Sequence, residues 1–571
     1  MPHEKSFMET IIPRVVRKTK HKIEDYLKQA TSISIIIDIW DSKQMADFIG
    51  VCASATFSDM SRKLFVIGLG RMLGDGHHTA ENIAKSTEKI VGQYEFNYNK
   101  IKGIICDEGR ALVKLLKQVI NCDELDHELD DDILKYCIID IDESSINQIK
   151  NFNNDDEIDE IFEDIRPLEK LNVISTEEIE ENNNEDDDTN ENDKDEDQYN
   201  LSNGNELINE LTLVVGSSKY PRFSCANHKI NIATRKAIKS NKQLIKIVAK
   251  LNKFSSHTHQ SVIDTQVFSI NKNRLRSENI TRWSSTFLLM FSFYKAYVKG
   301  IFNEDYKCPV TRSQLEFYLT MLYPLYKFTL FHQRNSANIA STIPTVQALI
   351  QKYEKMSVEP KKKQFCNSII QNIKKKFEFE LDSNVYAVAT LLDVGRIKDW
   401  NGKPFANDLK VKALNSIPQI GDEFLNIRKE TVTQEVQPST STASNQFNEL
   451  TNDDSFERYF CNTDSEGENE IISKKKSLSE ETKRFKNLIE NCKTKITTRA
   501  FWQENKLNLP LLFELTNILQ NIPSSSAYVE RFFSICGVVN RKRAGNMSDE
   551  TLINRSFLKT NLNILQNINN H

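Results

Sequence analysis

The 571-residue sequence predicts an α/β core followed by a large all-helical domain. Two patterns predict this fold class. Short apolar runs rich in β-branched residues occur at Ser32–Ile39, Phe48–Phe57 and Leu64–Met72, and the short turns between them favour an antiparallel meander. From about 240 to 428, by contrast, the apolar residues recur at helical spacing. The chain is too long for one ordinary domain, so a two-part architecture fits its length.

The other elements follow from the same apolar spacing and from capping signals such as Thr79. In the core we expect a helix over 5–29, a helix over Ala80–Tyr94, a strand over Lys102–Cys106, a helix over Ala111–Ile120, a fifth strand over Tyr220–Ala226 and a helix from Asn227. In the second part we expect helices over Leu244–Phe254, Ser284–Val298, Ser313–Gln333, Pro344–Met356, Lys363–Glu378 and Tyr386–Leu392.

Two polar stretches interrupt these patterns. Residues 121–210 hold 33 acidic against 5 basic residues, a composition that cannot bury enough apolar surface to offset chain entropy. We interpret 122–212 as an acidic disordered insertion and 429–480 as a polar linker. The resulting division is 1–30 as an N-terminal helical segment, 31–121 and 213–240 as the core, 241–428 as the all-helical insertion domain, and 481–571 as a helical C-terminal block.

Charge and composition narrow the function classes. The net charge is −5, but outside residues 121–210 the chain holds 70 basic and 47 acidic residues. This basic body favours a polyanion partner, and the acidic segment is either a competitor for it or a plain solvated tract. The sequence lacks an apolar stretch of membrane-spanning length, and its ten cysteines show no disulfide framework, so we expect no membrane partner and free thiols.

Three acidic residues predict a site for nucleotidyl transfer. Asp38 and Asp107 lie at or near the ends of strand-like runs, and Glu530 lies on an expected helix near the end of the chain. Two strand-end acids and a late helical acid are the carboxylate set of an RNase H-like site. Their oxygens are ligands that Mg²⁺ and Mn²⁺ prefer, and two such ions drive phosphoryl transfer. Taken singly, each acid is more often a turn, cap or surface residue.

Several short motifs surround these acids in a fixed order along the chain. Through these motifs the chain resembles a hAT-superfamily (hobo/Activator-type) transposase. The segments that carry the resemblance are Asp38-Ile39-Trp40, His78-Thr79-Ala80-Glu81-Asn82-Ile83, Cys225-Ala226-Asn227-His228, Thr281-Arg282-Trp283-Ser284-Ser285, Ser525–Ser534 and the tail through Leu558–Asn561. The resemblance spans most of residues 5–566 outside the two polar stretches.

The resemblance implies an RNase H-like core interrupted by an all-helical insertion, and cut-and-paste transposition in the nucleus. It implies that Asp38, Asp107 and Glu530 bind two Mg²⁺ or Mn²⁺ ions and catalyse DNA cleavage and strand transfer. It also implies that Trp283 stacks on a flipped base, whereas without the flanking Arg282 and Ser284 we would interpret it as a core tryptophan on an amphipathic helix. The expected partners are double-stranded DNA, as element ends and target, and a second copy bound through the C-terminal dimerisation region.

The roles of two further motifs stay open. Cys225 and His228 lack the partner pair that a four-ligand zinc site needs, so no zinc is predicted and His228 is interpreted as a structural or DNA-contacting residue. The basic run Arg541, Lys542 and Arg543 suits phosphate contact or nuclear import, and equally a solvated turn.

The sequence departs from the family pattern in three places, of which the missing finger and Glu108 favour an alternative. Members of the family usually begin with a BED-type zinc finger, but this sequence has no Cys and His set for one before Ile33. Recognition of the element ends is therefore expected to be missing or to lie on an upstream exon. Glu108 and Asp41 add acids beside Asp107 and Asp38. The alternative is therefore a domesticated or immobile hAT-derived protein that dimerises and binds DNA without catalysis.

Overall fold

The computed structural model describes residues 7–41, 47–73, 80–107, 213–215, 218–271, 273–278, 283–304, 306–425, 477–490, 496–540, 547–562 and 564. The predicted acidic insertion (122–212), the predicted helix over 111–120 and most of the predicted linker (429–480) lie outside these ranges. Within the ranges, no helix is long and apolar enough to cross a lipid bilayer.

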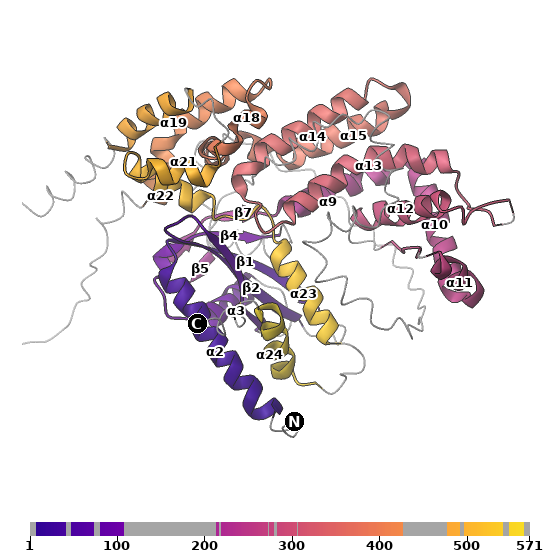
Figure 1. The fold of residues 1–571 in the computed structure, drawn as a ribbon, viewed down its shortest axis with the longest axis horizontal. Coiled ribbons are helices and arrows are strands. Elements are labelled where there is room, and N and C mark those ends of the chain that lie inside the picture. Colours follow the sequence, from indigo (N-terminus) through magenta and orange to yellow (C-terminus); the bar gives the residue numbers. More distant parts are fainter. Residues whose placement is uncertain are drawn as a thin grey trace, which may run out of the picture.

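A mixed five-stranded sheet forms the centre of the core (Figure 1). Its strands are β1 (Ser32–Asp41), β2 (Asp47–Thr56), β3 (Arg62–Arg71), β4 (Ile101–Cys106) and β7 (Arg222–Ser224), in the spatial order β3-β2-β1-β4-β7. Strands β1, β2 and β3 pair antiparallel, whereas β4 runs parallel to β1 and to β7. The sheet and the large helical region after it are consistent with the predicted RNase H-like core and helical insertion.

The sheet is buried on both faces. Neighbouring residues of β1 such as Ile35 and Ile36, which point to opposite faces, are both fully buried. The elements packed around the sheet are a π-helical turn (Phe7–Ile11), α2 (Ile12–Gln29), α3 (Ala80–Val91), a 3₁₀ turn (Tyr98–Lys100), α23 (Ala527–Val539) and α24 (Asp549–Thr560). A separate two-stranded ribbon pairs β5 (Leu213–Val215) with β6 (Ser218–Tyr220).

A long helical region separates β7 from α23 and extends across the top of Figure 1. Its helices are α9 (Ala226–Ser240), α10 (Lys242–Gln260), α11 (Val262–Ile270), α12 (Trp283–Val298), α13 (Arg312–His332), α14 (Thr342–Met356), α15 (Pro360–Lys376), α16 (Glu378–Asp382), α17 (Asn384–Leu392), α18 (Ile397–Trp400), α19 (Ala406–Phe424), a helix over 477–490, α21 (Thr498–Asn505) and α22 (Pro510–Leu519), with 3₁₀ turns at Ile339–Ser341 and Val394–Arg396.

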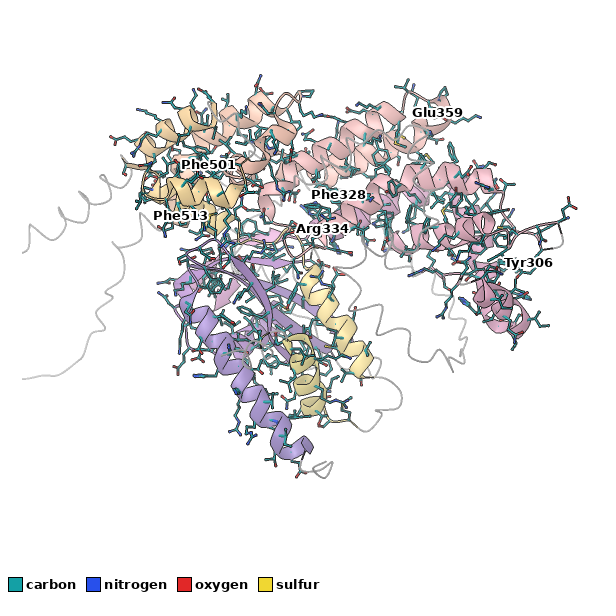
Figure 2. All side chains as sticks on the ribbon, in the orientation of Figure 1. Tyr306, Phe328, Arg334, Glu359, Phe501 and Phe513 are labelled. Atoms are coloured by element: carbon teal, nitrogen blue, oxygen red, sulfur yellow. The ribbon has the colours of Figure 1, made fainter. Side chains whose placement is uncertain are left out.

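Aromatic residues fill this region. In the lobe of α19, α21 and α22, where Figure 2 labels Phe501 and Phe513, the buried Trp502 donates a hydrogen bond of 2.8 Å from Nε1 to the carbonyl of Leu392. Tyr306, labelled at the opposite end of the region in Figure 2, donates to Asp264 on α11. The helical region therefore has packed cores of its own.

The predicted boundaries differ from the observed ones mainly near residue 220. The predicted fifth strand, Tyr220–Ala226, is divided between β6, which ends at Tyr220, and β7, which covers only Arg222–Ser224. Proline explains the break: Pro221 lies between the two strands and has no backbone N–H to donate to a ladder. The strand β5 and the helices α11 and α19 were not among the predicted elements.

Candidate active site at the ends of β1 and β4

The register of the sheet brings Asp38 and Asp107 to neighbouring positions. The last pair of the parallel β1–β4 ladder is Ile37 with Cys106. The next residues are Asp38, which lies within β1, and Asp107, which directly follows β4. Adjacent strands lie about 4.8 Å apart and paired positions point to the same face. The two carboxylates therefore leave one edge of the sheet on the same side.

Helix α23 packs on the face of the sheet to which Asp38 points. Gly50 of β2 pairs with Asp38, and a Cβ atom on Gly50 would lie 2.5 Å from Phe533 Cε1 and 2.9 Å from Val529 Cγ2. Trp40, two residues after Asp38 and thus on the same face, stacks on Phe533 with ring centroids 6.2 Å apart. Because Glu530 directly follows Val529, this close contact brings it to the edge where the aspartates end.

The carboxylate of Asp107 lies between the first turns of two helices. Ser526, the residue that precedes α23, donates from Oγ to Asp107 Oδ1 at 2.9 Å instead of capping its own helix. His228, the third residue of α9, places Nδ1 3.0 Å from Asp107 Oδ2. The N-terminal ends of helices carry partial positive charge, so both ends favour an ionised carboxylate there.

These contacts decide the protonation state of Asp107. Burial raises its pKa, but the hydrogen bond and charge of His228, with smaller contributions from Ser526 and Cys225, outweigh burial and hold the pKa below its ordinary value. The buried thiol of Cys225 changes in the opposite direction: burial first, and then the charges of Asp107 and Glu530, raise its pKa. Cys225 is thus a neutral thiol that lies near both acids.

A buried polar seam fixes the segment that leads into α23. The side chain of Asn521 donates to Ser32 Oγ at 3.3 Å, to Ser34 Oγ at 3.4 Å and to the carbonyl of Ser54 at 3.2 Å. In return, Ser54 Oγ donates to Asn521 Oδ1 at 2.8 Å. Asn521 and the three serines are fully buried. Their hydrogen bonds therefore fix the segment before α23, and with it the start of the helix that carries Glu530, to β1 and β2.

The end of α13 holds α23 from the other side. His332 Nδ1 lies 2.8 Å from Ser524 Oγ, and its backbone carbonyl accepts a hydrogen bond from Ser525 Oγ. Arg531, next to Glu530, donates from Nη1 to the carbonyl of Gln333 at 2.5 Å. Figure 2 labels Arg334 at this junction between the helical region and the sheet. The helical region therefore contacts the residues on both sides of Glu530.

Of the other predicted site residues, Trp283 contacts α9 one turn after His228, and the rest lie outside the described ranges. Trp283 is the first residue of α12 and is only 3% exposed, with its backbone N–H 2.9 Å from Asn231 Oδ1. Its indole Nε1 is buried with no hydrogen-bond partner in the described part of the chain. Stacking on a base would first require this ring to be uncovered, and the role stays a prediction. Arg282 and the run Arg541–Arg543 lie outside the described residues.

Carboxylates such as Asp38 of β1, Asp107 after β4 and Glu530 of α23 have the oxygen donors that a hard divalent cation prefers. Within the residues that the structure describes, however, no group of three or more His, Cys, Asp and Glu side chains is gathered closely enough to hold a metal ion. Both oxygens of Asp107 are engaged instead by Ser526 and His228. Each of these oxygens keeps a second lone pair, so the two contacts do not by themselves exclude a metal ion at Asp107.

Sequence reasoning missed three residues that build the corner. Ser526 belongs to a motif that was noted only for Glu530. His332 gave no signal because it lies in an apolar helical pattern, and Asn521 gave none because an asparagine after a helix is ordinary. Their partners are separated from them by 192 to 489 positions. For His228, the structure adds a specific contact to the predicted structural role, namely the hydrogen bond to Asp107.

Comparison with known proteins identifies the C-terminal block. Residues 476–563 match the hAT family C-terminal dimerisation region. This stretch includes the helix over 477–490, α21, α22, α23 and α24, and hence Glu530 with its serine anchors. A search of curated proteins found no match to the chain.

Proposed function

Since residues 476–563 are a hAT family C-terminal dimerisation region, we propose that the whole chain is a hAT-type DNA transposase whose catalytic acids are Asp38, Asp107 and Glu530. The observation that carries this proposal is the docking of α23 over Gly50 and its link through Ser526 to Asp107. This docking supports a site in which a glutamate from the end of the chain joins Asp38 of β1 and Asp107, which follows β4. RNase H-like strand cleavage needs this combination of acids.

The proposed cofactor is Mg²⁺ or Mn²⁺, held by the three acids. Ions of this kind, when bound, activate the attacking oxygen and stabilise the leaving one. The chain's own residues prepare the ligands: Ser526 and His228 keep Asp107 ionised, and Arg531 fixes the turn of α23 that presents Glu530. Double-stranded DNA is the proposed substrate and the nucleus the proposed compartment.

We also propose that the protein forms a homodimer through its C-terminal block. Two observations support this proposal: the match of residues 476–563 to a dimerisation region, and two exposed leucines within that stretch. Leu507, in the turn between α21 and α22, is 92% exposed, and Leu488 in the helix over 477–490 is 38% exposed. Large apolar side chains exposed to this extent favour a protein partner.

The proposal is tested with DNA cleavage by Glu530→Gln. The substrate is found by sequencing the genomic DNA on both sides of the reading frame and taking any flanking inverted repeats as synthetic ends. In the presence of Mg²⁺ or Mn²⁺ we expect the wild type to nick these ends and the variant to lose nicking by at least about 100-fold, since a metal ligand is removed. Glu514→Gln, an exposed glutamate of α22, is the matched control and should cleave normally. Unchanged cleavage by Glu530→Gln would refute its role.

A second candidate function, dimerisation and DNA binding without catalysis, is favoured by one observation. The described residues contain no ready-made group of three metal ligands, and Asp107 is occupied by protein partners. If the reading frame lacks flanking repeats and the wild type fails to cleave DNA with either ion, this second function replaces the first.

A further inference from the structure

Helix α10 carries a row of lysines on its solvent side, outside the candidate active site. Lys242, Lys246, Lys250 and Lys253, here called the lysine row, are all exposed and follow one another at spacings of four, four and three residues. This spacing places them on one face of the helix. The opposite face carries the buried residues Leu244, Ile247, Val248 and Leu251.

No acidic residue of its own helix neutralises the lysine row. Helix α10 contains neither Asp nor Glu, and within the described ranges no lysine of the row makes an ion pair or a hydrogen bond. Other exposed basic residues do pair along their helices, as Arg312 does with Glu316 at 3.1 Å and Lys28 with Glu24. Four like charges in sequence repel one another, so their arrangement favours an external anion.

The helix that presents the row is fixed in place. Asn252 donates to Glu278 Oε2 at 2.9 Å, and Ser255 donates to the carbonyl of Arg276 at 3.1 Å, so the loop 273–278 is held against the second half of α10. That loop adds an exposed arginine, Arg274. The row is therefore presented by a helix whose second half is held in place.

We propose that the lysine row binds the phosphate backbone of duplex DNA. Successive lysines four residues apart are separated by about 6 Å along the helix axis, which is near the distance between alternate phosphates of one strand along the duplex axis. The row starts about 20 Å from His228, because α9 leads from that residue to α10 over 14 residues. This inference rests on the proposed function for its ligand and adds a DNA-holding surface distant from the acids.

The test compares salt dependence of DNA binding between two quadruple variants of the full-length protein. The first replaces the lysine row with glutamine (K242Q, K246Q, K250Q and K253Q). The control removes the same number of exposed lysines from α15 (K361Q, K363Q, K374Q and K375Q). Fluorescence anisotropy with a labelled duplex of arbitrary sequence gives Kd at several salt concentrations.

For the row variant, we expect the slope of log Kd against log salt to fall by about 1 per lysine, or about 3 to 4 in total, for any DNA sequence. The control should keep the wild-type slope. An unchanged slope in the row variant would overturn the proposal, and an equal loss in the control would assign the effect to net charge. Tighter DNA binding by the row variant would also overturn it and would indicate that the acidic segment 121–210 occupies the row.

The row test is independent of catalysis, because Glu530→Gln should bind DNA with the wild-type slope. A protein that never cleaves DNA but shows the predicted slope change in the row variant would therefore refute only the proposed function.

Discussion

At the scale of single residues, the corner around Asp107 depends on polar side chains whose partners are far away in sequence. Ser526 donates its hydroxyl to Asp107, and its oxygen accepts no hydrogen bond from the first turn of α23, although it stands at the capping position. Such a capping hydrogen bond usually stabilises a helix by about 1 kcal/mol. The structure thus lacks this local contact and has instead one that orients and ionises a candidate catalytic acid.

His332 predicts a specific dependence of stability on pH. Burial lowers its pKa from 6.5 to about 3, so the folded protein keeps the imidazole neutral while the unfolded chain binds a proton below pH 6.5. The stabilisation is complete above pH 6.5 and is lost progressively as the pH falls toward 3. In His332→Asn we expect lower stability at pH 7 but a free energy of unfolding that falls less steeply in this window, by up to about 1.4 kcal/mol per pH unit.

Denaturant unfolding at a series of pH values measures this difference. His257→Asn is the control, because that imidazole is 78% exposed and its removal should leave the wild-type slope. If His332→Asn loses stability with pH as steeply as the wild type, His332 does not stay neutral in the folded protein.

Residues of the candidate site could be found from the sequence only where the side chain is itself a typical catalytic or metal-binding group. Asp38 and Asp107 could be located because an acid at the end of an isoleucine-rich run is conspicuous. Asn521 could not, since an asparagine after a helix is ordinary in sequence and its value comes from Ser32, Ser34 and Ser54, which three-dimensional folding alone brings to it.

At the scale of elements, the docking of α23 depends on the absence of a side chain at Gly50. We expect Gly50→Ala to destabilise the fold by about 1–3 kcal/mol, because its Cβ would overlap Phe533 and Val529 and push α23 away from the sheet. DNA cleavage should fall more than the loss of folded protein explains, since Glu530 moves with the helix. Thermal unfolding and cleavage rates measured together separate the two effects.

Gly537, on the same helix, provides the matched control. A Cβ there would meet nothing within 4 Å, so Gly537→Ala should stabilise α23 by roughly 0.5–1 kcal/mol and keep cleavage intact. Equal behaviour of the two variants would mean that the close approach at Gly50 does not position the helix.

Strands and helices of the core were predictable to within a few residues, because their buried faces make apolar residues recur at regular spacing in the sequence. Strand β1 was predicted over Ser32–Ile39 and extends to Asp41, and α3 ends at Val91 rather than at Tyr94. The short elements were not predictable: β7 has three residues, and its place in the sheet is set by pairing with β4 rather than by its own composition.

At the scale of the whole molecule, the tail packs within its own chain. In α24, Leu552 and Phe557 are buried, and Asn561 exchanges two hydrogen bonds with the backbone of Val66 on β3. The apolar side chains of this tail, which belongs to the predicted dimerisation region, thus contribute largely to the core, and Leu562 at its end is 47% exposed. Removing the tail would therefore test folding as much as association.

A surface substitution tests the proposed dimer more cleanly. Leu507→Arg should reduce the mass measured by light scattering toward that of one 65.9 kDa chain, because a charge would be buried in the interface. Val358→Arg, at a residue that is 82% exposed but lies outside 476–563, should leave the mass unchanged. If both variants keep a dimeric mass, Leu507 lies outside the interface.

The central claim, that Asp38, Asp107 and Glu530 form one metal site, is tested most directly by calorimetric titration of the full-length protein with Mn²⁺. We expect the wild type to bind Mn²⁺ and each of Asp38→Asn, Asp107→Asn and Glu530→Gln to weaken binding by at least about ten-fold, with Asp59→Asn, which removes an exposed acid, as the unaffected control. Mn²⁺ binding that is the same in all three variants as in the wild type, or absent from the wild type, would contradict the account.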